Sequence, residues 1–77
     1  MDAMTVAVDI AKSTFHVAVA DRHWHVVGHH RFTRTRFARF LTTTPSTHIV
    51  MEACGTAHYW GRLAQQHGHT VVLLPPT

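Results

Sequence analysis

Apolar residues fall at nearly every second position along the first third of the chain, as they do in β-strands with one buried face. Three such runs, at 4–10, 14–20 and 24–32, are separated only by short polar segments. Alternation of this kind, interrupted by tight turns, predicts three strands joined as an antiparallel meander. Gly28 lies inside the third run, where a glycine often marks a β-bulge.

The spacing of apolar residues changes after Thr33, which is a typical N-cap residue. Phe37 and Leu41 are then separated by one helical turn, so a helix is predicted from this point. Phe32, just before the cap, is placed to pack against Phe37 as a hydrophobic staple. The helix is expected to end in the threonine-rich run before Pro45, because a proline disfavours helical geometry in the residue before it.

Three further elements are predicted in the second half of the chain: a strand at 47–52, a helix at 57–67 and a buried strand at 69–74. Gly61 lies inside the helix, where glycine costs roughly 1 kcal/mol against alanine. Either another element packs closely against it, or the helix is weaker than its pattern suggests. Gly68 is suited to the C-terminal cap.

The predicted order of elements is therefore β-β-β-α-β-α-β. Strands separated by helices pair in parallel through right-handed crossovers, so the simplest sheet is mixed and has the first strand at its centre. This arrangement is the opening half of a ribonuclease-H-like fold. It is equally the opening half of the actin-like sugar-kinase ATPases, so topology alone does not decide between the two.

Composition narrows the class of protein. A chain of 77 residues with 45% hydrophobic residues fits one small packed domain. It contains no run long enough for a membrane-spanning helix and no secretory signal, and its lone cysteine fits a reducing compartment, so a cytoplasmic location is expected. The formal charge is +3, and four arginines are interleaved with phenylalanines within nine residues: Arg31, Arg34, Arg36 and Arg39. They form a solvated helix face, a phosphate-contacting surface, or both.

Candidate chemistry comes from two of the four acidic residues. Asp9 and Glu52 stand at the ends of apolar runs, where an ionised carboxylate is costly unless it is paired or binds a metal. The other two, Asp2 and Asp21, lie at the terminus and in a turn. If the strands bearing Asp9 and Glu52 are neighbours, they lie about 4.8 Å apart and their carboxylates could share one Mg²⁺. The alternative is that Asp9 caps the following turn and Glu52 pairs with a basic residue.

Three rival sites are weaker. His23, His25 and the pair at 29–30 could approach a zinc ion, but their spacing matches no standard zinc signature. Cys54 and His58 are one helical turn apart and could act as a nucleophile and base, although a small buried cysteine explains the former as well. The hypothesis of an ATPase requires a glycine-rich phosphate loop after the first strand, and no glycine is present there.

Two segments carry a resemblance to a known family: Asp9-Ile10-Ala11-Lys12-Ser13-Thr14-Phe15, and Met51-Glu52-Ala53-Cys54-Gly55-Thr56-Ala57-His58-Tyr59-Trp60. They resemble the DEDD transposases of the insertion sequence 110 family, which includes the Piv-type DNA invertases. The stretch at 68–76 is similar to that family's next strand. The resemblance implies a RuvC-like domain of ribonuclease-H-like fold with an acidic tetrad. Asp9 would be its first aspartate and Glu52 its glutamate, both catalytic and both binding Mg²⁺.

The resemblance also implies that the family's two remaining aspartates, and a second domain with a serine thought to attack DNA, lie beyond Thr77. Neither Ser13 nor Ser46 has a matching context. We therefore expect residues 1–77 to form a single truncated RuvC-like N-terminal domain, inactive alone, from a transposase that cleaves and transfers DNA strands in transposition. The expected partners are DNA, a guide RNA in some members, and further copies of the full-length protein. Residues placed to contact nucleic-acid backbones are Lys12, Arg34, Arg36 and Arg39. The alternative function is a non-catalytic nucleic-acid-binding or oligomerisation module.

Overall fold

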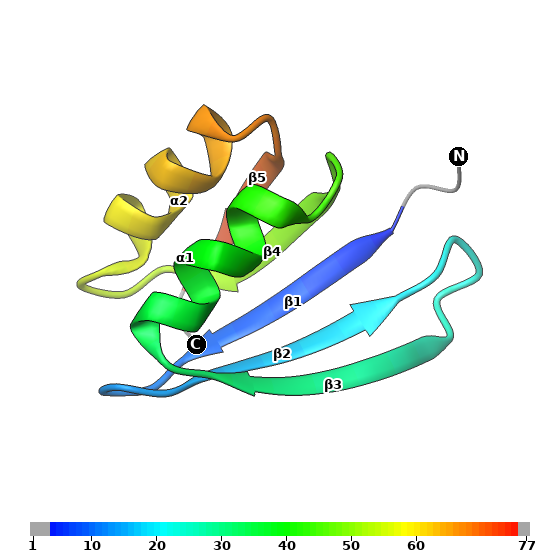
Figure 1. Cartoon of the computed structure of the whole chain (residues 1–77), viewed down its shortest axis with the longest axis horizontal. Helices are drawn as coiled ribbons and strands as arrows, with labels where there is room; N and C mark the ends of the chain where they lie inside the picture. Colours follow the sequence, from blue (N-terminus) through cyan, green and yellow to red (C-terminus); the bar gives the residue numbers. More distant parts are fainter. Residues whose placement is uncertain (1–3, 76–77) are drawn as a thin grey trace.

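The computed structural model describes residues 4–75, so Asp2 lies outside the described residues. Seven elements follow one another in the predicted order (Figure 1). They are β1 (Thr5–Ile10), β2 (Phe15–Ala20), β3 (Val26–Phe32), α1 (Arg34–Thr43), β4 (His48–Glu52), α2 (Ala57–Gln66) and β5 (Thr70–Leu74). Both helices are ten residues long, and no helix in the described part of the chain could cross a membrane.

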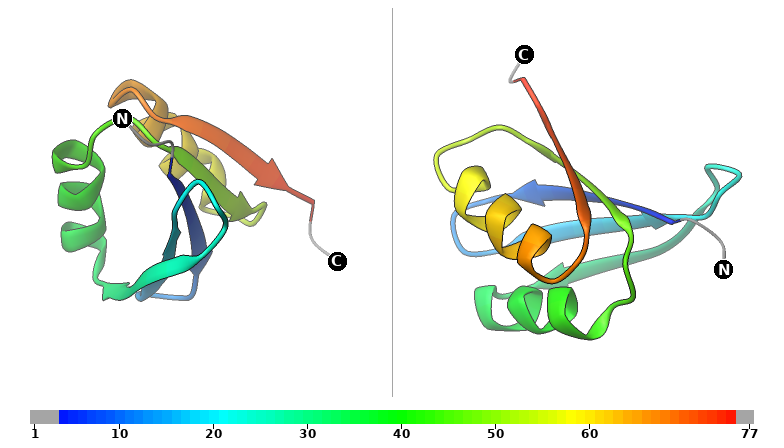
Figure 2. Two further views of the ribbon diagram at one scale, coloured as in Figure 1. Left: turned by 90° about the vertical axis from the view of Figure 1, so that its right-hand side faces the viewer. Right: turned by 90° about the horizontal axis from the view of Figure 1, so that it is seen from above.

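The five strands form one mixed sheet in the order β3-β2-β1-β4-β5. β1 pairs antiparallel with β2 and parallel with β4, which confirms the central position predicted for the first strand. Both helices lie over the same face of the sheet (Figures 1 and 2). The other face, which we call the open face, is not covered by any element of residues 4–75. This α/β arrangement is consistent with the first half of a ribonuclease-H-like fold.

The hydrophobic core lies between the sheet and the two helices, and aromatic rings join its layers. Phe15 of β2 stacks on Phe37 of α1 with ring centroids 4.6 Å apart, and Trp60 of α2 meets Phe15 edge-on at 4.9 Å. Aromatic pairs of this kind contribute beyond the area they bury. The rest of the core comes from alternate residues of the strands and one face of each helix: Val6, Val8, Val17, Ile49, Met51, Leu41, Ala57 and Ala64.

The helix ends are formed as the sequence predicts. The Thr33 side chain accepts a hydrogen bond from the Arg36 amide at 3.2 Å, and the rings of Phe32 and Phe37 lie 6.5 Å apart across the first turn. Gly68 adopts a φ of +89°, the left-handed conformation that suits a helix C-terminus. Gly61 is buried against β5, and a Cβ at this position would lie 3.5 Å from Val71, which is an ordinary van der Waals contact.

Three local expectations are corrected. β5 is an edge strand whose side chains alternate between half-buried and exposed, so it is not a buried strand; it lies at the border of a sheet with one open face. Cys54 is exposed and fills no buried space, because the loop that carries it lies outside the core. The irregularity in the β2–β3 ladder skips Val27, one residue before Gly28.

The turn between β2 and β3 is built around Asp21. Its carboxylate accepts hydrogen bonds from the amides of His23 at 2.8 Å and His25 at 3.0 Å, and its backbone pairs with that of His25. Trp24, at the tip, has a φ of 65° and is 74% exposed. This left-handed residue explains why β3 begins at Val26, although the apolar pattern predicts a start at Trp24.

His69 joins three segments at the edge where β4 and β5 begin. The ring is only 4% exposed, and its Nδ1 accepts a hydrogen bond from the Thr47 amide at 3.3 Å. Nε2 must therefore carry the ring proton, and it donates to the Leu41 carbonyl at 2.7 Å. One imidazole thus satisfies the end of α1 and the start of β4 together.

We expect His69→Ala to lower the free energy of unfolding by about 2–4 kcal/mol, because two buried backbone groups lose their partner. Urea denaturation followed by circular dichroism measures the effect. His58→Ala, at an exposed histidine on α2, is the control and should change stability by less than about 0.5 kcal/mol. Equal midpoints for the two variants would contradict the role assigned to His69.

We expect Trp24→Gly to raise the free energy of unfolding by about 1 kcal/mol, because a left-handed backbone costs residues with a Cβ roughly 1–2 kcal/mol and costs glycine nothing. Trp24→Ala is the matched control, since it removes the same ring but keeps the Cβ. A glycine variant no more stable than the alanine variant would show that the turn is not strained.

Candidate functional site

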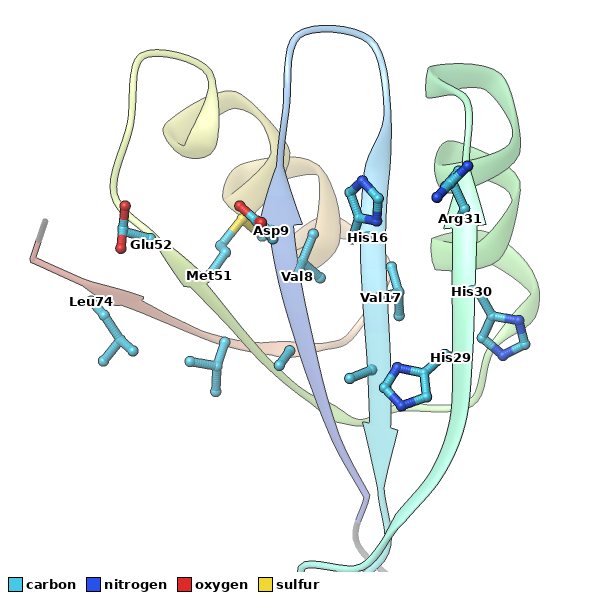
Figure 3. Close-up of a pocket in the computed structure, with 13 residues that line it drawn as sticks. Val8, Asp9, His16, Val17, His29, His30, Arg31, Met51, Glu52 and Leu74 are labelled. Atoms are coloured by element: carbon cyan, nitrogen blue, oxygen red, sulfur yellow. The ribbon is translucent and has the colours of Figure 1, made fainter.

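Asp9 and Glu52 come together on the open face of the sheet. β1 and β4 pair in parallel with Val8 opposite Met51, so Asp9 and Glu52 are the next residues in the same register. Neighbouring strands lie about 4.8 Å apart, and residues in register point to the same face. Figure 3 shows the two carboxylates at one level on adjacent strands.

Both carboxylates are exposed, and within residues 4–75 neither forms an ion pair or a side-chain hydrogen bond. The expected cost of burying them therefore does not arise, because no element of the described chain covers this face. The alternative roles are not seen either. The turn after β1 is closed by the backbone, with the Ala11 amide donating to the Thr14 carbonyl at 2.9 Å, and Glu52 has no basic partner among the described residues.

A row of polar side chains extends from the carboxylates across the sheet. Asp9 pairs with His16 of β2, and His16 pairs with Arg31 of β3, so the open face carries Arg31, His16, Asp9 and Glu52 side by side on four strands (Figure 3). His16 was not among the predicted site residues, and Arg31 was noted only as part of the arginine cluster. His16 could have been found from the sequence, because the turn between β1 and β2 is short. Pairing Ile10 with Phe15 across this turn places His16 opposite Asp9.

A shallow hollow of about 470 Å³ lies over this row. Small apolar residues form part of its lining, and its polar groups include His29 and His30 of β3 as well as the four residues of the row. Lining residues include Ala7, Asp9, His16, Ala18, Val50 and Glu52. The two carboxylates therefore stand at one end of a sheet face that carries both apolar and polar side chains.

The two carboxylates offer hard oxygen ligands, which Mg²⁺ prefers, but a six-coordinate ion would need water or further protein groups for its other positions. No cluster of three or more histidine, cysteine or acidic side chains within ligand reach occurs among residues 4–75. The zinc alternative finds no support in that range: the rings of His23 and His25 are 6.2 Å apart in the β2–β3 turn, with no third ligand. Cys54 and His58 are both exposed and form no hydrogen bond with each other in the described chain.

The four basic residues predicted to contact nucleic acid are all exposed. Ile10, Phe15 and Phe32 are partners across β1, β2 and β3, so the turn bearing Lys12 and the start of α1 lie at the same edge of the sheet as the carboxylates. Arg34 and Arg36 belong to the first turn of α1, which contains no acidic residue, and Arg39 follows further along the helix. The three arginines of α1 therefore lie on the helix-covered side of the sheet, whereas Lys12 lies in the turn at the end where the carboxylates stand.

Comparison with known proteins identifies relatives of the whole chain. A family model for the DEDD transposases of the insertion sequence 110 family, described as "Transposase", matches residues 6–77. The chain is 41% identical over 76 residues to the "Probable family 20 transposase" of Pseudomonas aeruginosa, covering 99% of this chain and 22% of the relative. It is 34% identical to the "Transposase for insertion sequence element IS1328" of Yersinia enterocolitica, with 92% and 21% covered. It is 31% identical to the "Transposase for insertion sequence element IS1111A" of Coxiella burnetii, with 97% and 21% covered.

The chain thus spans about a fifth of the length of the curated relatives it matches. Comparison with solved structures gives no significant match.

Proposed function

The chain belongs to the DEDD transposases of the insertion sequence 110 family, and from this membership we propose that Asp9 and Glu52 supply two of four metal-binding acids to a Mg²⁺-dependent centre. This centre cleaves and transfers DNA strands during transposition. The single observation that supports the proposal is the register of β1 and β4, which puts side by side on one face two carboxylates that have no partner within residues 4–75.

The chemistry of the donor set fits this role in part. Paired carboxylates bind Mg²⁺ through oxygen and leave positions for water and for substrate phosphate oxygens. When bound, such ions activate an attacking oxygen and stabilise a leaving one at a phosphodiester. Asp9 and Glu52 alone are too few for a pair of ions, so the remaining acids come from the longer transposase. The 77-residue chain by itself should therefore bind the metal weakly and have no cleavage activity.

The neighbouring side chains are arranged to complement this centre. His16 and Arg31 continue the row away from Asp9 on the same face. Arg31 brings a guanidinium to the open face, where it would contact a phosphate of the bound strand. Lys12, in the turn between β1 and β2 at the same end of the sheet, would contact the backbone of the nucleic acid. These residues position the strand, while the two acids hold the metal.

We expect Mn²⁺, used as a paramagnetic substitute for Mg²⁺, to broaden the amide NMR signals around residues 9 and 52 at millimolar concentration. Asp9→Asn and Glu52→Gln should each abolish this selective broadening, because a single carboxylate with water is a poor site. Asp21→Asn is the control, since it removes a carboxylate at the opposite edge while an asparagine can keep the turn. Broadening that persists in either site variant would contradict the metal assignment.

Activity is tested in a longer protein, in which the remaining sequence of the Pseudomonas aeruginosa relative follows this chain. Asp9→Asn and Glu52→Gln should each lower Mg²⁺-dependent strand cleavage by more than about 100-fold, because even groups that only support metal ligands contribute 10- to 100-fold. Cleavage at the wild-type rate in either variant would refute the catalytic assignment.

A second function, non-catalytic binding of nucleic acid, is favoured by the exposed arginines of α1. Within residues 4–75 no carboxylate pairs with any of them, so their charge is available to phosphates. This function needs neither the metal nor the downstream acids.

We expect the triple variant Arg34→Ala, Arg36→Ala, Arg39→Ala to reduce the salt dependence of nucleic-acid binding. The slope of log K against log[salt] should fall by about 2–3, since each phosphate contact contributes about 0.7–0.9. Fluorescence anisotropy at several salt concentrations measures the slope, with Arg62→Ala, at an exposed arginine of α2, as the control. An unchanged slope in the triple variant would remove these residues from the binding surface.

A further inference from the structure

A second hollow, of about 350 Å³, lies at the opposite end of the open face from the carboxylates. It is formed between the tip of the β2–β3 turn and the starts of β1 and β4, and its lining residues are Thr5, Asp21, Arg22, Trp24, His48 and Val50. Val50 also lines the hollow over the carboxylates, so the two hollows adjoin on one face of the sheet.

Trp24 adopts an unfavourable backbone conformation at this hollow. Its φ of 65° is a strained conformation for a large side chain, and the ring is 74% exposed, so packing in the core does not explain it. The hydrogen bonds of the Asp21 carboxylate to the amides of His23 and His25 hold the turn in this shape. The turn therefore presents an indole face at the rim of the hollow.

The lining defines the chemistry of a ligand. The indole offers a flat aromatic surface, and Val50 offers an apolar floor. Thr5 and His48 bring hydrogen-bonding groups to the edges, and the oppositely charged Asp21 and Arg22 complete the lining. A planar ligand with hydrogen-bonding edges fits the indole, the apolar floor and the polar edges of this lining.

We propose that this hollow holds one unpaired nucleobase of a single-stranded nucleic acid, stacked on Trp24. This inference rests on the proposed function in one respect, because it takes a nucleic acid as the partner. Bases in single strands commonly stack on exposed aromatic side chains, whereas a base inside a duplex is already stacked on its neighbours and cannot enter. A strand held here would run along the open face toward Asp9 and Glu52.

Trp24 can be tested directly, because the only other tryptophan, Trp60, is buried in the core. We expect thymidine and uridine 12-mers to quench the exposed Trp24 fluorescence, and a blunt 12-base-pair duplex to leave it unchanged. Trp24→Gly should weaken single-strand binding roughly 5- to 150-fold, the range for loss of one base–aromatic stack, and change duplex binding less than about twofold. Trp24→Tyr should retain most of the affinity.

The glycine variant relieves backbone strain, so misfolding does not confuse the result, and thermal melting checks this. Tyr59→Ala removes an exposed aromatic ring from α2, on the helix-covered side, and should leave both binding and quenching unchanged. Stronger quenching by one 12-mer than by the other tells whether DNA or RNA is preferred, and either result supports the inference.

Three results would overturn the inference: no quenching by any single strand, unchanged single-strand affinity in Trp24→Gly, or an equal loss on single strand and duplex. None of them bears on Mn²⁺ broadening around residues 9 and 52. The proposed metal centre can also fail by itself. If Asp9→Asn leaves the Mn²⁺ broadening intact while single strands still quench Trp24, the metal centre is refuted and the inference about Trp24 is not.

Discussion

The parallel pairing of β1 with β4 determines both the core and the candidate site. Val6 and Val8 face the helices together with their partners Ile49 and Met51, and all four are buried. A slip of one residue in either strand would turn its apolar side chains to the open face and bury its polar ones. Burial of these residues therefore fixes the register, and the register in turn places Asp9 beside Glu52.

Much of this arrangement could be predicted because it follows from local patterns. The helix starting after Thr33, the Phe32–Phe37 staple and the glycine after α2 each depend on a few adjacent residues, and each is confirmed. The central position of β1 follows from the rule that strands joined through helices pair in parallel. The adjacency of Asp9 and Glu52 follows from the same rule, since both stand at the ends of such strands.

The remaining features depend on information that no local pattern contains. The all-apolar run of β5 suggests a strand buried on both faces, yet Val72 and Leu74 are 46% and 48% exposed because no described element covers the open face. The left-handed Trp24 breaks the preference of its residue type, since the hydrogen bonds of Asp21 determine the turn. Eight of the nine histidines are exposed, and only the tertiary contacts of His69 distinguish it from the others.

The two faces of the sheet have different physical requirements. The helix-covered face is closed by apolar packing and by the buried hydrogen bonds of His69, so it needs nothing further. The open face combines two carboxylates that have no partner within residues 4–75 with the exposed apolar side chains of Leu74, which is paired with Glu52, and Val72, two residues before it. On the proposed function, a segment bringing further acids to Asp9 and Glu52 would also cover these apolar residues. Burial of apolar surface and completion of the metal centre would then be one coupled step, since dehydrating the carboxylates is costly unless the metal is present.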